Sequence, residues 1–398
     1  MMNDTRFEQL RTALQSESDR RIDVNQAWDR FQRRRPQASR RRRRLIASVA
    51  AAAVVAAVSV SAAVVRLDGR VSSPSSVGTA AVSPVAARIP VADVVGMTAG
   101  GSDVWALTGS HELVRIDART NAVTLRAPIA GVADSSAVVA GGGAVWLDGS
   151  GPAGHARLLK VDPATGAVSA QTTLPAGCSQ AAYGLDHVWV LCIGAKTVKV
   201  LRIDPATAQV DAQTGALPGP AFSFAAGSEG VWLGTSAGLR QVDPSGTHLT
   251  GLTVTGSAKY LSVHSPDYVG PLVVAELALG DGVVWALAGN VSGQPEHLVE
   301  INPVTGRIIV AFTYPEVADS NDFWDLNAAF GQGSIWMLAP LSGNEIVRVS
   351  VTSGEPVSRV DPGGSCSQYC MQVYAIAGAV WEPTAQQIIR IDPARMPG

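Results

Sequence analysis

Seven of the nine tryptophans recur at nearly even intervals along most of the chain. Successive members of this series are 41, 43, 43, 53, 51 and 45 residues apart: Trp105, Trp146, Trp189, Trp232, Trp285, Trp336 and Trp381. A period of this length indicates a repeat protein, in which each unit holds one supersecondary structure. The 398-residue chain is therefore expected to contain one large repeat domain rather than several unrelated ones.

The unit around Trp285 can be followed residue by residue. In 277–287, two apolar segments flank Gly280-Asp281-Gly282, which favours a tight hairpin because glycine accepts a positive φ. Residues 298–301 predict a third strand, and Asn-Pro-Val-Thr-Gly at 302–306 predicts the turn that follows it. Residues 307–312 supply a fourth strand. Each unit is thus expected to be a four-stranded antiparallel blade.

The third strand and its turn recur at 158–166, 201–208, 239–246 and 346–354, and the chain ends soon after another copy at 388–392. The last unit has no room for a fourth strand, so residues 88–91, just before the first unit, are expected to supply it. Such pairing closes the ring and removes exposed sheet edges. We therefore predict an all-β fold, a seven-bladed β-propeller over residues 88–398.

A strand ending in Val-Trp, followed by a strand and turn of the type Arg-Ile-Asp-Pro-x-Thr-Gly, resembles the YVTN and streptogramin-lyase-like group of β-propellers. The resemblance covers residues 88–398 and implies the fold but no single activity, because such propellers include lyases, binding modules and scaffolds. We interpret the repeated tryptophans as packing between blades. The turn aspartates are interpreted as turn-capping groups rather than ligands: Asp162, Asp204, Asp243 and Asp392.

Residues 45–65 are all apolar or small, without a charge, and are long enough to form a single transmembrane helix. Arginines at 33–35 and 40–44 precede this segment, so residues 1–44 are expected in the cytoplasm and the propeller outside the cell membrane. Residues 66–87, rich in Ser, Pro and Ala, are expected to be a linker. The alternative is a cleaved twin-arginine export signal, with 60–62 as the cleavage site.

Residues 1–44 show apolar residues at helical spacing and form a basic, α-helical cytoplasmic stub in our interpretation. The stretch Asp-Val-Asn-Gln-Ala-Trp-Asp-Arg-Phe at 23–31 resembles the cytoplasmic tails of bacterial transmembrane regulators of the anti-sigma or iron-dicitrate-regulator type. That resemblance implies a cytoplasmic regulator as partner. The alternative is that Trp28 and the arginines dock the stub to the inner leaflet of the membrane.

All four cysteines follow the predicted membrane segment. Cys178 begins the inner strand of its unit and Cys192 ends the next strand, so a hairpin centred near Leu185 places them opposite each other. Cys366 and Cys370 form the second local pair. Two disulfides are the natural pairing in an oxidising exterior. We expect no metal site, because no CxxC pair is present.

Ligands of propellers usually meet the loops that enter the inner strands, around the mouth of the central channel. Polar residues about nine to twelve positions before a repeated tryptophan, and those of the two longest insertions, are therefore candidates for binding. The candidates are Asp93, Asp134, Tyr260, His264, Glu276, Asp322, Asp325 and Tyr369. If catalysis occurs here, His264 is the base and Glu276 or Asp322 holds a cation. The streptogramin lyases carry a Glu-x-His pair that this chain lacks.

The sequence contains no P-loop, nucleophile elbow, HExxH or dinucleotide fingerprint, and we expect no cofactor. The acidic part after the membrane segment argues against nucleic acid as a partner. We predict a membrane-anchored, extracytoplasmic binding module for a protein or small ligand, acting as a transmembrane sensor or as a scaffold. The alternative is a lyase-like enzyme with its site at the channel mouth.

Overall fold

The computed structural model describes residues 83–132, 137–150, 155–235, 238–251, 273–280, 282–289, 295–313, 328–339, 345–363 and 372–396. Within these ranges the secondary structure is β, apart from turns and a short 3₁₀ helix at Pro393–Arg395. No helix of these ranges is long and apolar enough to cross a bilayer. The predicted stub and transmembrane helix, and all but the last residues of the predicted linker, lie outside the described residues.

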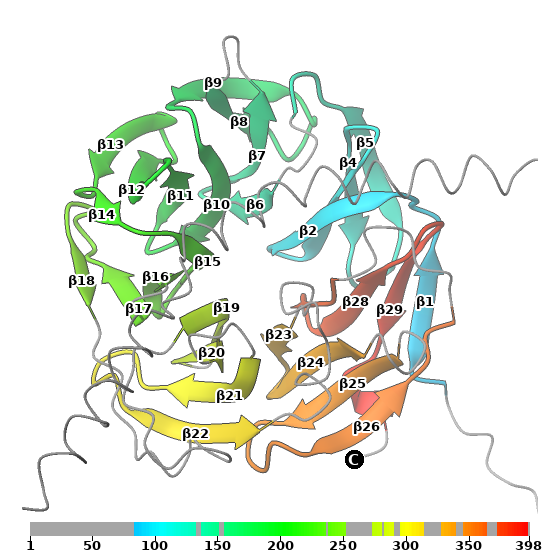
Figure 1. Ribbon diagram of the computed structural model, residues 1–398. Coiled ribbons are helices and arrows are strands. Elements are labelled where there is room, and N and C mark those ends of the chain that lie inside the picture. Colours follow the sequence, from blue (N-terminus) through cyan, green and yellow to red (C-terminus); the bar gives the residue numbers. More distant parts are fainter. Residues whose placement is uncertain are drawn as a thin grey trace, which may run out of the picture.

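The strands form seven antiparallel sheets arranged as blades around a ring (Figure 1). Blade 1 contains β2 (Val94–Gly100), β3 (Asp103–Thr108), β4 (Glu112–Asp117) and β5 (Val123–Pro128). Blade 2 contains β6 (Val138–Gly141), β7 (Ala144–Ser150), β8 (Ala156–Val161) and β9 (Val168–Leu174). Blade 3 contains β10 (Cys178–Gly184), β11 (His187–Ile193), β12 (Thr197–Asp204), β13 (Gln209–Gln213) and the short β14 (Leu217–Pro218).

Blades 4 to 7 follow the same order from the inside outward. Blade 4 contains β15 (Ala221–Gly227), β16 (Gly230–Thr235), β17 (Gly238–Val242) and β18 (Leu249–Gly251), and blade 5 contains β19 (Val273–Gly280), β20 (Val283–Gly289), β21 (Pro295–Ile301) and β22 (Ile308–Thr313). Blade 6 contains β23 (Ala328–Gly331), β24 (Ser334–Ala339), β25 (Glu345–Ser350) and β26 (Pro356–Val360). Blade 7 contains β27 (Tyr374–Ile376), β28 (Ala379–Pro383), β29 (Ile388–Ile391) and β1 (Val85–Ile89). The seven-bladed β-propeller predicted from the tryptophan series is confirmed.

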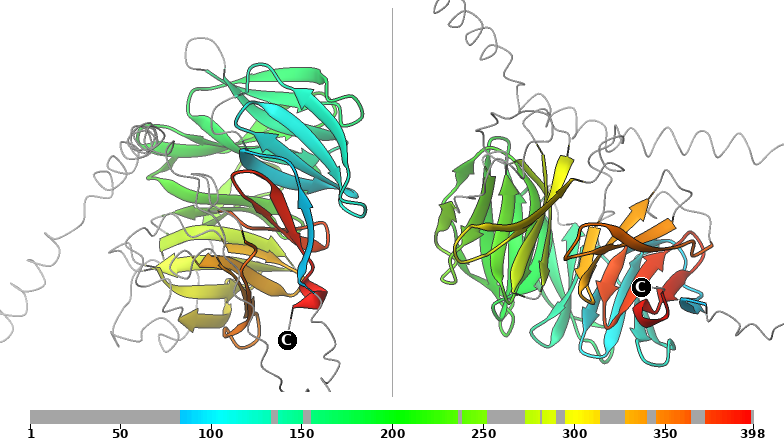
Figure 2. Two further views of the ribbon diagram at one scale, coloured as in Figure 1. Left: turned by 90° about the vertical axis from the view of Figure 1, so that its right-hand side faces the viewer. Right: turned by 90° about the horizontal axis from the view of Figure 1, so that it is seen from below.

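The ring closes where the two ends of the domain meet. Strand β1 pairs with β29 and forms the outer strand of blade 7, as predicted (Figure 2). Its bounds differ from the predicted 88–91, because β1 begins at Val85 and ends at Ile89. Pro90 follows directly, and a proline has no amide hydrogen with which to continue a β-ladder.

Each repeated tryptophan packs against the next blade. Trp105 belongs to one apolar cluster with Val138 and Val145 of blade 2, and Trp381 to one with Val104 and Val114 of blade 1. The tryptophans also fix the inner hairpins: the indole N–H groups of four of them donate at 2.8–3.0 Å to the carbonyl five residues earlier, at Trp146, Trp189, Trp336 and Trp381. The interpretation of the series as packing between blades is confirmed.

The inner strands of neighbouring blades approach closely at their terminal glycines. A Cβ added to Gly184 would lie 2.4 Å from the amide nitrogen of Gly227, the corresponding residue of blade 4. A Cβ on Gly141 would overlap the ring of Tyr183 in blade 3. Glycine at these positions lets the inner strands pack into a narrow ring.

The two faces of the ring are built differently. On the hairpin face, the first and second strands of all seven blades are joined by two residues each. On the opposite crossover face, the outer strand of one blade continues into the inner strand of the next. These crossovers are unequal: 175–177 enters blade 3, whereas 252–272 enters blade 5 and 314–327 enters blade 6.

Candidate functional site

A repeated contact lies across most interfaces between blades, and we call it the cation latch. In four blades, an Arg or Lys of the third strand lies directly opposite the tryptophan, with its cationic centre 5.6–5.7 Å from the centroid of the indole ring: Arg115, Lys160, Arg348 and Arg390. This distance is within the range of cation–π attraction. The third strand of blade 3 carries Arg202 at the equivalent position.

Four of these five cations also donate to the following blade: Arg115, Lys160, Arg202 and Arg390. Lys160 donates at 2.7 Å to the carbonyl oxygen of Pro205, and Arg202 donates at 2.7 Å to that of Pro244. Both acceptors lie in the turn after the third strand of the next blade. The latch therefore joins two blades through one side chain, in addition to the apolar packing of the tryptophan.

Blades 4 and 5 break this pattern. Gln241 lies opposite Trp232, and Glu300 lies opposite Trp285. Both interfaces of blade 5 thus lack the cation found at the equivalent position of the other five blades. Glu229 supplies a different link between blades 4 and 5, since it accepts a hydrogen bond from the amide of Gly282 at 3.2 Å.

A small cavity lies between blades 5 and 6. Its volume is about 10 Å³, which is room for about one water molecule, and it is partly open to solvent. Blade 5 contributes Glu276, Ala278, Trp285, Leu287 and Leu298, and blade 6 contributes Ala328, Ala329, Phe330 and Ile335. The rings of Trp285 and Phe330 stack across the interface with centroids 5.8 Å apart. The wall is apolar except for the single carboxyl group of Glu276.

Strand β19 directs Glu276 into this interface. Glu276 pairs with Leu287, which pairs with Leu298 on the next strand, so the three side chains share one face of blade 5. A bulge between Val274 and Glu276 sets this register. Burial raises the pKa of Glu276 to about 7, and the hydrogen bond from the amide of Leu277 opposes this rise. This carboxyl can therefore change its charge near neutral pH.

Glu300 is the second carboxyl on this face of blade 5. It lies opposite Trp285, which is two residues from Leu287 on β20 and therefore points to the same side of the sheet. Burial raises the pKa of Glu300 as well. The interface thus carries Glu300 at the position where five other blades carry a cation, in addition to Glu276.

Two of the eight predicted binding residues lie in the described part of the chain. Asp93 has a positive φ of 55° just before β2, and its carbonyl accepts from the amide of Gly109 at 2.7 Å. Glu276 lines the cavity. They belong to blades 1 and 5, and no hydrogen bond or ion pair among the described residues joins them. The other six lie outside the described residues: Asp134, Tyr260, His264, Asp322, Asp325 and Tyr369. The proposed base His264 is among these six.

The turn aspartates cap their turns, as predicted. Asp162 accepts from the amides of Ala164 and Thr165 at 2.8 and 2.9 Å, and these bonds lower its pKa. Asn302 and Ser350 do the same in blades 5 and 6. Among the described residues, no three His, Cys, Asp or Glu side chains are grouped as a metal site would need.

Cys178 and Cys192 lie opposite each other on β10 and β11 and form a disulfide, as the hairpin predicted. Cys366 and Cys370 lie outside the described residues.

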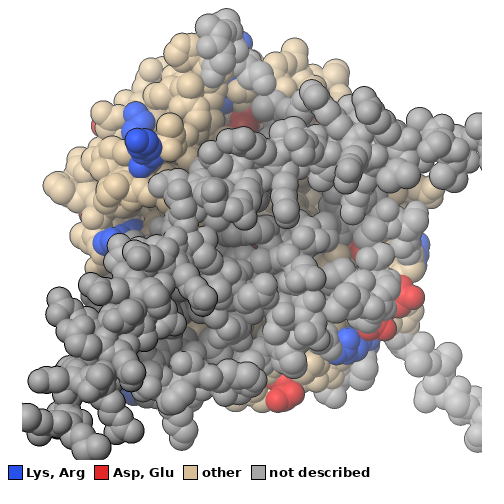
Figure 3. Space-filling view, in the orientation of Figure 1, with Lys and Arg blue, Asp and Glu red and all other residues tan. Residues whose placement is uncertain are grey.

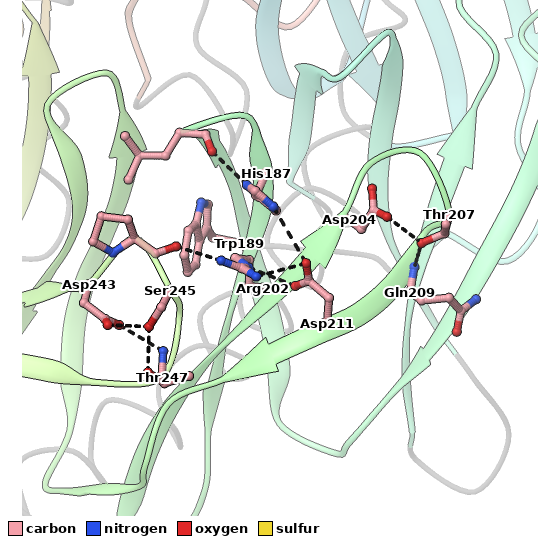
Figure 4. Close-up of polar contacts among 12 residues, drawn as sticks. His187, Trp189, Arg202, Asp204, Thr207, Gln209, Asp211, Asp243, Ser245 and Thr247 are labelled. Carbon is pink, nitrogen blue, oxygen red and sulfur yellow. Dashed lines mark hydrogen bonds and ion pairs between the residues drawn. The ribbon is translucent and has the colours of Figure 1, made fainter.

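A polar cluster on the hairpin face of blade 3 is shown in Figure 4. Arg202 donates to both carboxylate oxygens of Asp211, at 2.9 and 3.2 Å. The Nε2 atom of His187 lies 3.7 Å from Asp211, and its Nδ1 atom lies 2.8 Å from the carbonyl oxygen of Leu185. Both ring nitrogens face partners within the blade, so this histidine supports the latch of Arg202 rather than forming a separate site.

Two further buried carboxyl groups were missed by the sequence reasoning. Asp148 is 6% exposed, and burial raises its pKa to about 7. Glu382 is 1% exposed, and burial together with the charge of Asp361 raises its pKa to about 7, against the opposing effect of Arg88. Each of these two carboxyl groups lies within two positions of a repeated tryptophan, and this proximity in the sequence could have identified them as buried. Neither of the two lines the cavity.

On the face seen in Figure 3, the visible Lys, Arg, Asp and Glu side chains of the described chain are few and lie at separate places, and no large patch of one sign is seen.

Comparison with solved structures, at a TM-score above 0.5 for the Cps50 propeller, supports the fold. No family model matches the chain, and no curated protein matches it. The β-propeller domain of Cps50 (Swd1) from Myceliophteria thermophila is 11% identical, with a TM-score of 0.54 over 77% of this chain and 98% of that chain. BamB from Moraxella catarrhalis is 14% identical, with a TM-score of 0.43 over 75% of this chain and 82% of that chain. The chain is a seven-bladed β-propeller, and its family is not assigned.

Proposed function

We propose that this chain is a membrane-anchored, extracytoplasmic binding module that binds a protein or small ligand where blades 5 and 6 meet. The apolar wall with the single carboxyl of Glu276 carries this proposal. Ligand sites usually combine an apolar wall with a few well-placed polar groups.

Two further observations support the same place. Blade 5 lacks the cation latch on both sides, and departures from a repeated pattern are expected where function replaces stability. The two longest crossovers, 252–272 and 314–327, lead into the inner strands of blades 5 and 6. Repeat proteins place insertions on their binding face. Four of the predicted binding residues, Tyr260, His264, Asp322 and Asp325, belong to these crossovers.

The membrane part of the proposal rests on the sequence. Residues 45–65 anchor the chain, residues 1–44 face the cytoplasm and the propeller lies outside. Through the stub, binding outside is reported to a cytoplasmic regulator. The sequence pattern of the blades favours a relative of the YVTN and streptogramin-lyase-like propellers.

One observation favours a second candidate, a lyase-like enzyme. A carboxyl group with a pKa of about 7, as burial gives Glu276, is suited to general acid–base catalysis at neutral pH. In this case Glu276→Gln abolishes turnover. In a binding module the same change weakens ligand binding, and neither the wild type nor the variant shows turnover.

The proposal is tested by photo-crosslinking in the membranes of the source cell. A photoreactive amino acid replaces Ala328 in the cavity wall, and in a control chain it replaces Val168, which is 44% exposed on blade 2. We expect one defined adduct from position 328 and none from position 168. Equal adducts from both positions, or none from position 328, would contradict binding at this interface.

The role of the stub is tested in parallel by deleting residues 1–32. A sensor loses a cytoplasmic partner on deletion but keeps the adduct at position 328. If the protein is a passive scaffold, the same envelope proteins are recovered with the chain whether or not the stub is present. This result would contradict the signalling part of the proposal.

A further inference from the structure

Glu382 places a carboxyl group at a position where the other blades carry apolar side chains. It directly follows the repeated tryptophan of blade 7 on β28. The equivalent residues of blades 1 to 6 are Ala106, Leu147, Val190, Leu233, Ala286 and Met337. Glu382 is 1% exposed, and its Oε2 atom is buried and makes no hydrogen bond within the part of the chain that the structure describes. A buried polar atom without a partner costs stability, so an apolar residue would be the better choice if packing were the only role here.

The register of blade 7 places Arg88 on the same face as Glu382. Glu382 pairs with Ile389, and Ile389 pairs with Arg88 on β1. This face is turned toward blade 6, because Ile389 belongs to one apolar cluster with Trp336 and Ile346. Neighbouring strands lie about 4.8 Å apart, so the Glu382 and Arg88 side chains start about 10 Å from each other. The long side chain of an arginine can cover this distance.

In the structure, the guanidinium of Arg88 has other partners. It donates to the carbonyl oxygens of Pro362 and Gly363, at 2.6 and 3.0 Å. These two residues follow β26, the outer strand of blade 6, so a side chain of the closing strand β1 holds the end of the neighbouring blade. Arg88 thus has two alternative sets of oxygen acceptors within reach, the two carbonyls and the carboxyl group of Glu382.

Two charged groups act on Glu382 from the elements packed against it. The negative charge of Asp361, just after β26, raises the pKa of Glu382, and the positive charge of Arg88 lowers it. Burial has the largest effect and raises the pKa to about 7. The other charged side chains of these elements have partners of their own: Arg359 with Glu345 at 3.6 Å, Arg395 with Asp392 at 3.0 Å, Arg348 over Trp336, and Arg390 over Trp381 on the opposite face of blade 7.

We propose that Glu382 and Arg88 form a proton-operated switch at the closure of the ring. While Glu382 is protonated, the guanidinium stays on the two carbonyls and ties β1 to blade 6. When Glu382 loses its proton to water, the guanidinium moves to the new carboxylate and the tie to blade 6 is released. A buried carboxylate without a partner is costly, whereas the carbonyl of the exposed Gly363 can bond to water instead, so the exchange of partners is favourable. The switch goes beyond the proposed binding role, and neither depends on the other.

The test is hydrogen–deuterium exchange of the full chain in detergent micelles at pH 5.5 and pH 8.5, corrected for the intrinsic effect of pH on exchange. Mass spectrometry follows residues 357–363, which contain the tied end of blade 6, and residues 168–174 of β9 as an internal reference. We expect 357–363 to exchange at least about five-fold faster at pH 8.5, relative to the reference, because the tie no longer restricts local opening. Equal relative exchange at the two pH values would overturn the proposal.

Two variants separate the switch from a general loss of stability. In Glu382→Gln the side chain stays neutral, so 357–363 should exchange slowly at both pH values. In Arg88→Gln the guanidinium is absent, so the same segment should exchange fast at both. The matched control is Asp148→Asn, which removes another buried carboxyl with a pKa of about 7 and should keep the response to pH. A response that persists in Glu382→Gln, or that is lost in Asp148→Asn, would overturn the proposal.

Infrared difference spectra follow the proton itself. Between pH 5.5 and pH 8.5 the wild type should lose the stretching band of a protonated carboxyl that is absent from Glu382→Gln. In Arg88→Gln the midpoint of this loss should move to higher pH, because no cation then favours the carboxylate. A packing role of Arg88 would leave the midpoint unmoved, and that result would overturn the proposal.

Discussion

Arg390 of blade 7 donates a hydrogen bond to the side-chain oxygen of Asn121 in blade 1, at 3.3 Å. The guanidinium of Arg390 also lies 5.7 Å from the centre of the Trp381 ring. The cation latch therefore runs across the point where the ring closes, in parallel with the pairing of β1 and β29. The hydrogen bond joins residues that are 269 positions apart in sequence, and the strand pairing joins β1 to the last strand of the domain.

Removing one latch should loosen the ring measurably. In Lys160→Met the carbon chain is kept, but the cation over Trp146 and the hydrogen bond to Pro205 are lost. We expect the free energy of unfolding to fall by about 2–4 kcal/mol, the sum of a cation–π contact and a charged hydrogen bond. Urea denaturation measures the loss. Lys196→Met, which changes an exposed loop lysine, should be neutral, and an equal loss in this control would contradict the latch.

The close approach of inner strands is tested at Gly184. A Cβ there would lie 2.4 and 2.7 Å from the backbone nitrogen and oxygen of Gly227, and a backbone cannot move aside as a side chain can. Gly184→Ala should therefore destabilise the protein by about 1–3 kcal/mol. Gly215 has no atom within 4 Å of an added Cβ, so Gly215→Ala serves as the control in the same thermal unfolding series. Similar unfolding temperatures for both variants would show that the interface relaxes.

The fold could be predicted because its signals are local. The turn sequence around Asp162, the two-residue hairpins and the alternation of apolar residues each act within about ten residues, and seven copies repeat them. The pairing of Cys178 with Cys192 followed from the same local register. The exact bounds of β1 could not be predicted in this way, because they depend on where Pro90 interrupts a pairing with the far end of the chain.

The candidate site was harder to predict for a physical reason. The number of residues between a tryptophan and the residue opposite it depends on the length of the loop between the second and third strands. It is smaller between Trp381 and Arg390 than between Trp285 and Glu300. The repeated latch, and its absence in blades 4 and 5, are therefore difficult to recognise from the sequence. The face taken by Glu276 depends on one bulge residue, since a shift of one position reverses the side of a strand.

The disulfide should contribute strongly to blade 3. It links residues 14 positions apart and restricts the unfolded chain, a constraint worth about 3 kcal/mol for a loop of this length. Cys178→Ala together with Cys192→Ala should lower stability by about that amount. Alkylation of the unreduced, denatured wild-type chain, read by mass spectrometry, should leave both cysteines unmodified. Modification of either without reductant would contradict the bond.

The buried carboxyl groups predict a pH dependence with a definite sign. Burial raises the pKa of Glu382 to about 7, with Asp361 adding to the rise and Arg88 opposing it, from an ordinary value of 4.5. Between these values the folded chain holds a proton that the unfolded chain releases, so stability is highest below pH 4.5 with respect to this group and falls as pH rises toward 7. Glu276 and Asp148 act in the same direction.

We therefore expect the free energy of unfolding to fall between pH 5 and pH 7.5. In Glu382→Gln this fall should be smaller, by the contribution of Glu382. This contribution is at most about 3.5 kcal/mol, because one pKa unit corresponds to about 1.4 kcal/mol. Urea titrations at closely spaced pH values measure the slope, and Glu355→Gln at an exposed position is the matched control. If the slopes of Glu382→Gln and the wild type coincide, Glu382 does not hold its proton in the folded state. The profile of Glu382→Gln is expected to fall less steeply than that of the wild type, and not to be flat, because Glu276 and Asp148 still titrate.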